Sequence, residues 1–258
     1  DYDSVLVHLS SEFAVIGAWL WHMLGKRIGF WHNDAAAPLF ARIAIRFSDV
    51  VFYSNPDSFA AKYAHARYVP MGVEADMYML ERSAPKESLL FLGRLSARKN
   101  LDETIGAFGA VRENVQNLTL DVYGEPRQSD AGYAAKLRTK FAQLERGGAL
   151  SYKGSVLHDM TPSVYAAHEI FVHAGSAHGS KKTLYEAMAA GCLVITSEKE
   201  VREVIDPRFF LEKSTEENIA NAIRAALSLS EEKREHARSV SRAYVKREHA
   251  LSSVVPSV

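Results

Sequence analysis

Short runs of apolar and β-branched residues alternate with longer stretches in which apolar residues recur at helical spacing. Near the start of the chain this pattern predicts strands at 4–9, 27–31 and 50–53 and helices at 12–24 and 36–46. Strands that alternate with helices in this way are typical of βαβ units, whose strands pair in parallel. We therefore expect an α/β fold built on parallel sheets.

A second alternating series begins near residue 88 and runs through most of the remaining chain. It predicts strands at 88–95, 118–123, 149–152, 170–173 and 193–196, and helices at 101–112, 131–144, 162–167, 183–190, 215–228 and 231–248. Residues 69–88 interrupt the alternation with Pro, Gly and charged residues, which are typical of a crossing between domains.

The two series predict two Rossmann-like domains. We expect a shortened amino-terminal domain at 1–80 and a carboxy-terminal domain at 81–230. Residues 231–258 carry many charges and form a terminal helix that either covers the sheet or crosses back to the first domain.

Composition and charge narrow the function classes. The 258 residues include 31 basic and 31 acidic side chains, so no strongly basic surface argues for a nucleic-acid partner. The single cysteine, Cys192, excludes an intramolecular disulfide and fits a reducing compartment. The apolar stretch 13–24 is too short to span a bilayer and predicts a buried or interfacial helix. We expect a cytoplasmic protein, either in solution or at the inner face of the membrane.

Three charged turns follow predicted strands, where open α/β sheets bind ligands. In the first, 93–100, Arg94, Arg98 and Lys99 lie at the start of a helix. Cations there oppose the helix dipole by about 0.3–1 kcal/mol each. Taken singly, each side chain is explained by exposure to solvent, whereas the group of three indicates a bound anion.

The second turn, 174–191, resembles a damaged phosphate-binding P-loop. Gly175, Gly179 and Ser180 form a turn whose amides can face phosphate oxygens, and Lys181 and Lys182 add positive charge before a helix. A P-loop needs four residues between its glycines, whereas here three separate them. The turn therefore predicts an anion site of another kind, with a P-loop phosphotransferase as a distant alternative.

Glu186 lies one turn into the helix that follows. Helical side chains tilt towards the helix N-terminus, so its carboxylate can reach the space before the turn. A carboxylate there suits a pair of ribose hydroxyls, although acidic residues are also common in a first turn for electrostatic reasons.

The third turn, 30–34, contains the sequence FWHND. His32 follows a strand, where it could transfer a proton or donate a hydrogen bond, although a single His is more often structural. His168, His173 and His178 recur every five residues, a period that fits neither a helix face nor one side of a strand. We therefore expect no metal site.

As an ordered set, these segments resemble the retaining glycosyltransferases of family 4, which have the GT-B architecture. The matching segments are LFLGRLSARKN, LTLDVYGEP, YKGSVLHDMTPSVYAAHEIFVHAG and SAHGSKKTLYEAMAAGCLVITS, with a looser match in WHND and VPMGVEADMY. The resemblance implies two Rossmann-like domains, the amino-terminal one incomplete, and no cofactor or metal.

The resemblance also implies a nucleotide-diphosphate sugar donor and a saccharide or lipid-linked acceptor, with peripheral membrane contact. Arg94 and Lys99 would clamp the diphosphate, Glu186 would hold the ribose, and His32 and His178 would act near the transferred sugar. The implied donor-binding residues are Arg94, Lys99, Gly179, Ser180, Lys182, Thr183, Leu184 and Glu186.

The chain departs from the family pattern at two motifs. His178 replaces the first Glu of the family signature, with seven residues between it and Glu186, and the usual Gly-x-Gly-Pro is Gly124-Glu125-Pro126. Two functions therefore remain open. One is transfer of a sugar with retention of configuration, and the other is a catalytically silent relative that binds a nucleotide sugar or a partner protein.

Overall fold

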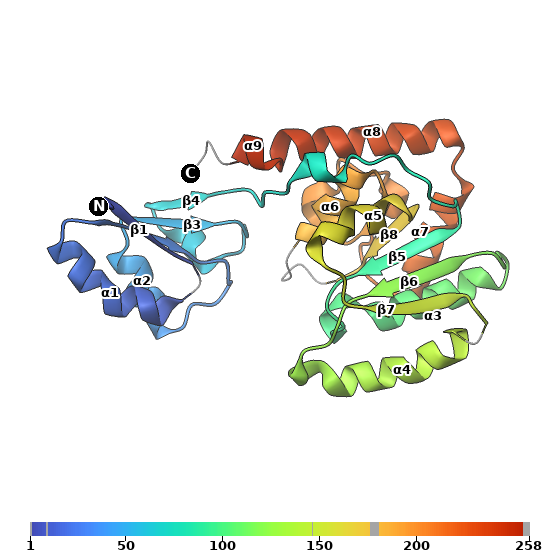
Figure 1. The fold of residues 1–258 in the computed structure, drawn as a ribbon, viewed down its shortest axis with the longest axis horizontal. Coiled ribbons are helices and arrows are strands. Elements are labelled where there is room, and N and C mark those ends of the chain that lie inside the picture. The colour runs from blue at the N-terminus through green and yellow to red at the C-terminus, as the bar shows by residue number, and fades with distance from the viewer. Residues whose placement is uncertain (1, 9, 146, 176–180, 255–258) are drawn as a thin grey trace. The chain divides into compact units, whose positions relative to one another are not determined.

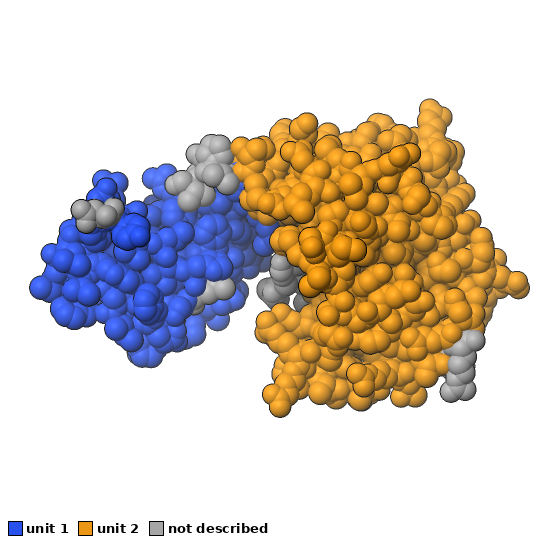
Figure 2. Space-filling model, in the orientation of Figure 1, with its two compact units in different colours: residues 1–71, 254–258 blue, residues 72–253 orange. Residues whose placement is uncertain are grey.

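The computed structural model describes residues 2–8, 10–145, 147–175 and 181–254. The chain divides into two compact units, which are coloured separately in Figure 2. The first comprises residues 1–71 and 254–258, and the second comprises residues 72–253. Each unit has its own parallel sheet, so the α/β class predicted from the alternating pattern is confirmed.

The first unit has a four-stranded sheet in the order β1-β2-β3-β4. Its strands are β1 (Ser4–His8), β2 (Arg27–Trp31), β3 (Val50–Tyr53) and β4 (Ala66–Tyr68), and its helices are α1 (Ser11–Met23) and α2 (Leu39–Phe47). The two helices lie beside each other in Figure 1. Phe30, Ile45 and Val51 are fully buried in the core between sheet and helices.

The second unit has a five-stranded sheet in the order β7-β6-β5-β8-β9. The strands are β5 (Ser88–Leu92), β6 (Thr119–Tyr123), β7 (Leu150–Gly154), β8 (Ile170–His173) and β9 (Leu193–Thr196). The helices are α3 (Leu101–Arg112), α4 (Ala131–Glu145), α5 (Thr161–Ala166), α6 (Lys182–Ala190), α7 (Glu216–Ser228), α8 (Glu231–Glu248) and α9 (Leu251–Val254). The strand order reverses between β5 and β8, and ligands of open α/β sheets bind at such a switch point.

Several elements differ from the sequence prediction in their bounds, and two of the differences have a clear local cause. Helix α2 begins at Leu39 instead of residue 36, because Pro38 disfavours helical backbone in the residue before it. The short edge strand β4 (Ala66–Tyr68) was not predicted, since three half-exposed residues give no clear alternation.

Helix α1 is not the buried helix that was one of the two expectations for 13–24. Ala14 and Ala18 face the core, whereas Phe13, Ile16 and Trp19 are exposed. No helix among the described residues is long and apolar enough to cross a membrane. The interfacial alternative for this segment stays a prediction.

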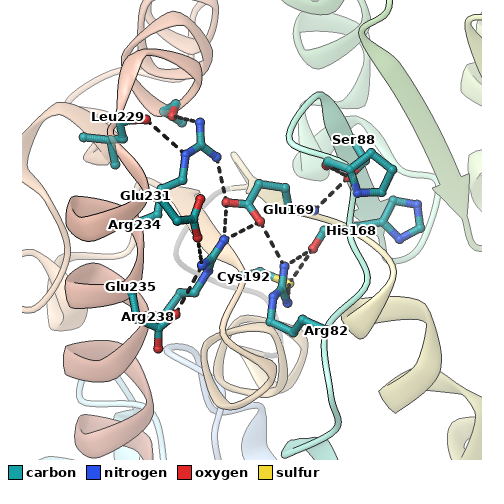
Figure 3. Close-up of polar contacts among 12 residues, drawn as sticks. Arg82, Ser88, His168, Glu169, Cys192, Leu229, Glu231, Arg234, Glu235 and Arg238 are labelled. Atoms are coloured by element: carbon teal, nitrogen blue, oxygen red, sulfur yellow. Dashed lines mark hydrogen bonds and ion pairs between the residues drawn. The ribbon is translucent and has the colours of Figure 1, made fainter.

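A buried carboxylate, Glu169, joins three parts of the second unit (Figure 3). Arg234 Nη1 and Arg238 Nη2 of α8 donate to its Oε1 at 2.7 Å each, and Arg82 Nη2 lies 3.3 Å from its Oε2. Arg82 also donates to carbonyl oxygens near the ends of α5 and α6, including Ala190 O at 3.1 Å. This Glu169 cluster therefore fixes α8 and the segment before β5 to the start of β8.

Candidate functional site

The carboxyl ends of β5, β6, β8 and β9 bring the charged turns of the second unit together. At the centre, Gly93 after β5 and Gly124 after β6 approach each other closely. Gly124 has φ +134°, and a Cβ there would lie 1.8 Å from the carbonyl oxygen of Gly93. Glycine is therefore required at 124, and Arg94, beside this contact, remains exposed.

Lys99 is held against the turn that follows β8. It ends a single 3-10 turn, Ala97–Lys99, and is followed by Asn100 in the left-handed conformation (φ 50°). Asn100 Nδ2 donates to the carbonyl oxygen of Ala174 at 2.7 Å, and a Cβ on Gly175 would lie 3.0 Å from Lys99 Cδ. A hydrogen bond thus joins the loops after β5 and β8, and Lys99, on the first loop, lies against Gly175 of the second.

Burial lowers the pKa of Lys99. The positive charge of Arg94 lowers it further, and the Glu198 carboxylate opposes both effects. A half-buried ammonium beside a second cation is stabilised by any anion that binds there.

Lys181 forms ion pairs with two carboxylates. Its Nζ lies 2.7 Å from Glu200 Oε1 and 3.3 Å from Glu198 Oε2. Burial alone would lower the pKa of Lys181, but the hydrogen bond and charge of Glu200 and the charge of Glu198 raise it. From the sequence, Lys181 was expected to add positive charge to an anion site. In the structure, the carboxylates of Glu198 and Glu200 balance that charge.

The acidic residues that balance Lys181 were missed from the sequence. Glu198 is almost fully buried just beyond β9, and Glu200 also accepts a hydrogen bond from the Tyr185 hydroxyl at 2.8 Å. Burial raises the pKa of Glu198, and Lys181 opposes the shift. The sequence SEKE, directly after a strand, is the signal that could have identified them.

Glu186 is buried at the start of α6 with a defined set of partners. Its Oε2 accepts a hydrogen bond from the Tyr165 hydroxyl at 3.2 Å, and its Oε1 lies 3.7 Å from Lys182 Nζ and 3.9 Å from His158 Nδ1. Lys182 and His158 are about half exposed, whereas Glu186 is not. The buried carboxylate therefore lies next to two half-exposed polar side chains, His158 and Lys182.

Two phenols support Glu186 from within. The Tyr78 hydroxyl lies 3.1 Å from Thr161 Oγ1, and the Tyr78 ring packs edge-on against Tyr165 at 5.8 Å. Burial raises the pKa of both tyrosines, and the Glu186 carboxylate raises it further. Both therefore remain protonated donors at neutral pH.

The remaining residues of the second turn divide into three groups. Thr183 has its carbonyl oxygen 3.2 Å from the Tyr165 hydroxyl. Leu184, an implied donor-binding residue, has a fully buried side chain, and its N–H donates to the carbonyl oxygen of Lys181 at 3.0 Å. His178, Gly179 and Ser180 lie outside the described residues.

His173, considered above only as a metal ligand, is a buried group at the end of β8. Its Nδ1 lies 3.4 Å from Thr196 Oγ1, and its Nε2 has no hydrogen-bond partner among the described residues. Burial, with Lys99 and Lys181 nearby, lowers the pKa of His173 to about 3. The imidazole is therefore neutral. Within the described ranges, no group of three or more His, Cys, Asp or Glu side chains could hold a metal ion.

His32 belongs to the first unit and lies just after β2. Its side chain is buried and stacks on Phe30 with 6.0 Å between ring centroids. Burial lowers the pKa of His32, Asp34 opposes the shift, and Nε2 has no hydrogen-bond partner among the described residues. A neutral imidazole with an unused nitrogen can accept or donate a proton.

Residues 86–228, more than half of the chain, match the family described as glycosyl transferases group 1. The chain belongs to this family. The resemblance inferred from the ordered motifs is therefore confirmed, and the Arg94, Lys99 and Glu186 turns fall within the matched region.

Curated relatives of this group 1 glycosyltransferase match over part of their length. The chain is 27% identical over 127 residues to the GtfA subunit of a UDP-N-acetylglucosamine–peptide N-acetylglucosaminyltransferase from Streptococcus parasanguinis, covering 49% of this chain and 24% of the relative. It is 26% identical over 153 residues to the alpha-monoglucosyldiacylglycerol synthase of Streptococcus pneumoniae, covering 58% of this chain and 34% of the relative. The matched segments thus span about a quarter to a third of these relatives.

Among solved structures, the chain is similar to HepE from Anabaena, crystallised with UDP and glucose. The TM-score is 0.81 at 16% identity, and the match covers 99% of this chain and 76% of HepE. At this identity the likeness establishes the fold, so the GT-B architecture predicted from the sequence is confirmed.

Proposed function

We propose that this group 1 glycosyltransferase transfers a sugar from a UDP-sugar to an acceptor with retention of anomeric configuration. The observation that supports the proposal is that Arg94, Lys99 and Glu186 all follow the carboxyl ends of β5 and β8, which are adjacent in one parallel sheet. The relatives named for UDP-N-acetylglucosamine and the fold neighbour crystallised with UDP support uridine as the base.

In this proposal, Arg94 and Lys99 bind the diphosphate and stabilise the negative charge that develops on it as the glycosidic bond breaks. Lys99 suits this role because its ammonium is half-buried and lies beside a second cation. Hydrogen bonds to charged groups contribute about 1.5–3 kcal/mol each.

Glu186 accepts hydrogen bonds from the ribose hydroxyls in the same proposal. The Tyr165 hydroxyl fixes one carboxylate oxygen, which leaves Oε1, beside His158 and Lys182, to meet the nucleoside. His32 of the first unit and His178 are proposed as the groups that act on the transferred sugar.

The acceptor is proposed only by class. One relative is named for a peptide acceptor and another for a diacylglycerol glycolipid, so a saccharide, peptide or lipid-linked hydroxyl is expected.

Calorimetry with UDP, UDP-glucose and UDP-N-acetylglucosamine tests the binding site. Arg94→Ala and Lys99→Ala should each weaken UDP binding about tenfold to a hundredfold. Arg224→Ala is the matched control, because Arg224 is an exposed cation on α7, which carries none of the proposed donor-binding residues, and should change binding by less than threefold. Equal effects of all three substitutions, or no UDP binding by the unmodified chain, would contradict the proposed site.

Hydrolysis or transfer of the UDP-sugar tests the activity. Glu186→Gln preserves the shape of the side chain and should abolish turnover, whereas Glu212→Gln, on an exposed surface, should not. The alternative function is a silent relative, favoured by Lys181, whose charge is balanced by Glu198 and Glu200. Binding of UDP without turnover would support that alternative.

A further inference from the structure

The second unit contains a cavity of about 470 Å³ beside the Glu169 cluster. The segment before β5, the residue before β8 and helix α8 line it, and all of its lining residues fall within 72–253. Because β5 and β8 begin there, the cavity lies at the amino edge of the sheet, opposite to the edge that carries Arg94 and Lys99. Small-molecule sites have volumes of about 300–1,000 Å³. The cavity is thus large enough for such a ligand and is separate from the proposed donor site.

Four guanidinium groups line this cavity, whereas its lining has one buried carboxylate, that of Glu169. The side chains of Arg82, Arg234, Arg238 and Arg242 are 11%, 1%, 10% and 25% exposed. Glu169 interacts with the first three of these arginines (Figure 3). A single carboxylate cannot balance four positive charges, so the buried part of the lining has an excess of positive charge.

Two exposed carboxylates, Glu231 and Glu235, reduce this excess without removing it. They accept hydrogen bonds from Arg238 Nη1 at 2.7 Å and 3.2 Å, but their side chains are 75% and 60% exposed, so water screens their charge. Arg242 Nη1 lies 3.8 Å from Glu235 Oε1, which is beyond hydrogen-bond distance. Arg242 is therefore the least compensated of the four arginines.

Three of the arginines also have spare hydrogen-bond donors. The Nε atoms of Arg82, Arg238 and Arg242 are buried and have no hydrogen-bond partner among the described residues. Arg234 differs, because its Nε donates to the carbonyl oxygen of Leu229 at 3.2 Å and both of its Nη atoms have acceptors. A buried charged donor without an acceptor is costly. Arg234 is thus explained by its structural contacts, whereas the other three can still donate to a ligand.

Arg82 and Arg242 are held together at the end of α6. Their Nη atoms donate to the carbonyl oxygen of Ala190 at 3.1 Å and 3.2 Å. A Cβ on Gly191 would lie 2.4 Å from Arg242 Nη2, so the glycine makes room for this guanidinium. Burial lowers the pKa of Arg242, the charge of Glu235 opposes this effect, and the charge of Arg82 lowers the pKa further. An anion beside both arginines would relieve their mutual repulsion.

We propose that this cavity binds the phosphate group of a small phosphorylated molecule through Arg82, Arg238 and Arg242. A guanidinium presents its N–H groups in a planar fork that matches the oxygens of a phosphate group. A phosphate monoester has a charge of about −1.5 to −2 at neutral pH, which offsets the excess of positive charge. The cavity is larger than a phosphate group, and Leu80 and Ala84 form an apolar part of its wall, where the rest of the molecule can lie.

This proposal does not depend on the transferase activity, because the cavity and the donor turns lie at opposite edges of the sheet. Phosphate can also bind to Arg94 and Lys99, so the experiment has to separate the two sites. Arg94→Ala removes a cation from the donor turns only, and this variant separates the sites even if the chain does not bind UDP.

Calorimetry with inorganic phosphate and with glycerol 3-phosphate, at an ionic strength kept constant with sodium chloride, tests the proposal. We expect glycerol 3-phosphate to bind at least as tightly as inorganic phosphate, and to bind equally well to the Arg94→Ala variant. Arg242→Gln should weaken binding about tenfold or more, because the amide lacks the charge of the guanidinium. Arg247→Gln is the matched control, since Arg247 lies on the same helix, is 68% exposed and pairs with Glu248. It should leave binding unchanged.

Lys86→Gln provides a second variant, because Lys86 is an exposed cation of the cavity lining and its replacement should not disturb folding. It should weaken binding about threefold, and far-UV circular dichroism checks the fold of every variant. The proposal is overturned if neither probe binds at millimolar concentration, or if Arg242→Gln and Arg247→Gln have equal effects. It is also overturned if Arg94→Ala abolishes binding, which would assign the anion to the donor turns, or if inorganic phosphate alone binds, which would exclude a phosphorylated molecule.

Discussion

The Glu169 cluster allows a quantitative test of how the second unit is stabilised. Glu169→Gln keeps the size of the side chain but removes the negative charge that Arg82, Arg234 and Arg238 share. Glu169 and Arg234 are 2% and 1% exposed, so water cannot replace the lost charge. Removing one partner of a buried ion pair costs about 3–5 kcal/mol, because the remaining charges are left unbalanced.

We expect Glu169→Gln to lower the free energy of unfolding by about 3 kcal/mol or more. Urea unfolding followed by far-UV circular dichroism measures this loss, because the signal includes the helices of the second unit. Tryptophan fluorescence reports on the first unit, since Trp19, Trp21 and Trp31 all belong to it.

Glu212→Gln is the matched control for charge removal at the surface. Its carboxylate lies 2.5 Å from Arg202, but the two side chains are 67% and 50% exposed. Exposed pairs contribute about 0–1 kcal/mol, so this substitution should change stability little. If Glu169→Gln costs no more than Glu212→Gln, the Glu169 cluster does not hold α8 to the sheet.

Two further predictions concern the centre of the candidate site. Gly124→Ala should destabilise the protein by several kcal/mol, since its Cβ would overlap the carbonyl oxygen of Gly93, whereas Gly132→Ala in α4 has open space and should stabilise it by about 0.5–1 kcal/mol. Thermal unfolding of both variants checks this, and similar effects of the two would contradict it. His173 has a pKa of about 3 in the folded protein and about 6.5 in the unfolded chain, so below pH 6.5 only the unfolded chain takes up its proton. Stability should therefore fall by up to about 1.4 kcal/mol per pH unit between pH 6 and 4, and His173→Gln should reduce this slope in urea titrations. An unchanged slope would refute the assignment.

The sequence predicted most of the fold because its apolar spacing agrees with the elements that form. Strands β2 and β8 and helices α3 and α8 have the predicted bounds, since each has a clear pattern and a clear end. Strand β4 was missed because it exists through pairing with β3, a contact that local spacing does not encode.

The candidate site was predicted less completely, for a physical reason. Arg94, Lys99 and Glu186 could be identified because each follows a strand or begins a helix in its own segment. The run SEKE marks Glu198 and Glu200 as charges at the end of a strand, but their partnership with Lys181 could not be predicted, because the pairing of β8 with β9 brings them to it. Local motifs thus show which charged residues lie near a strand end. The pairing of the strands determines which of those charges form ion pairs within the protein.

This balance limits how the proposed diphosphate can be bound. Lys181 is already neutralised by two carboxylates, so it has little charge to offer an additional anion. Lys99 differs, because its ammonium is half-buried beside Arg94, and Glu198 only partly compensates for that environment. A diphosphate should therefore gain most from Arg94 and Lys99 together, and their effects on UDP binding should be coupled. If Lys181→Ala weakened UDP binding as much as Lys99→Ala, the carboxylates beside Lys181 would have to release it when the donor binds.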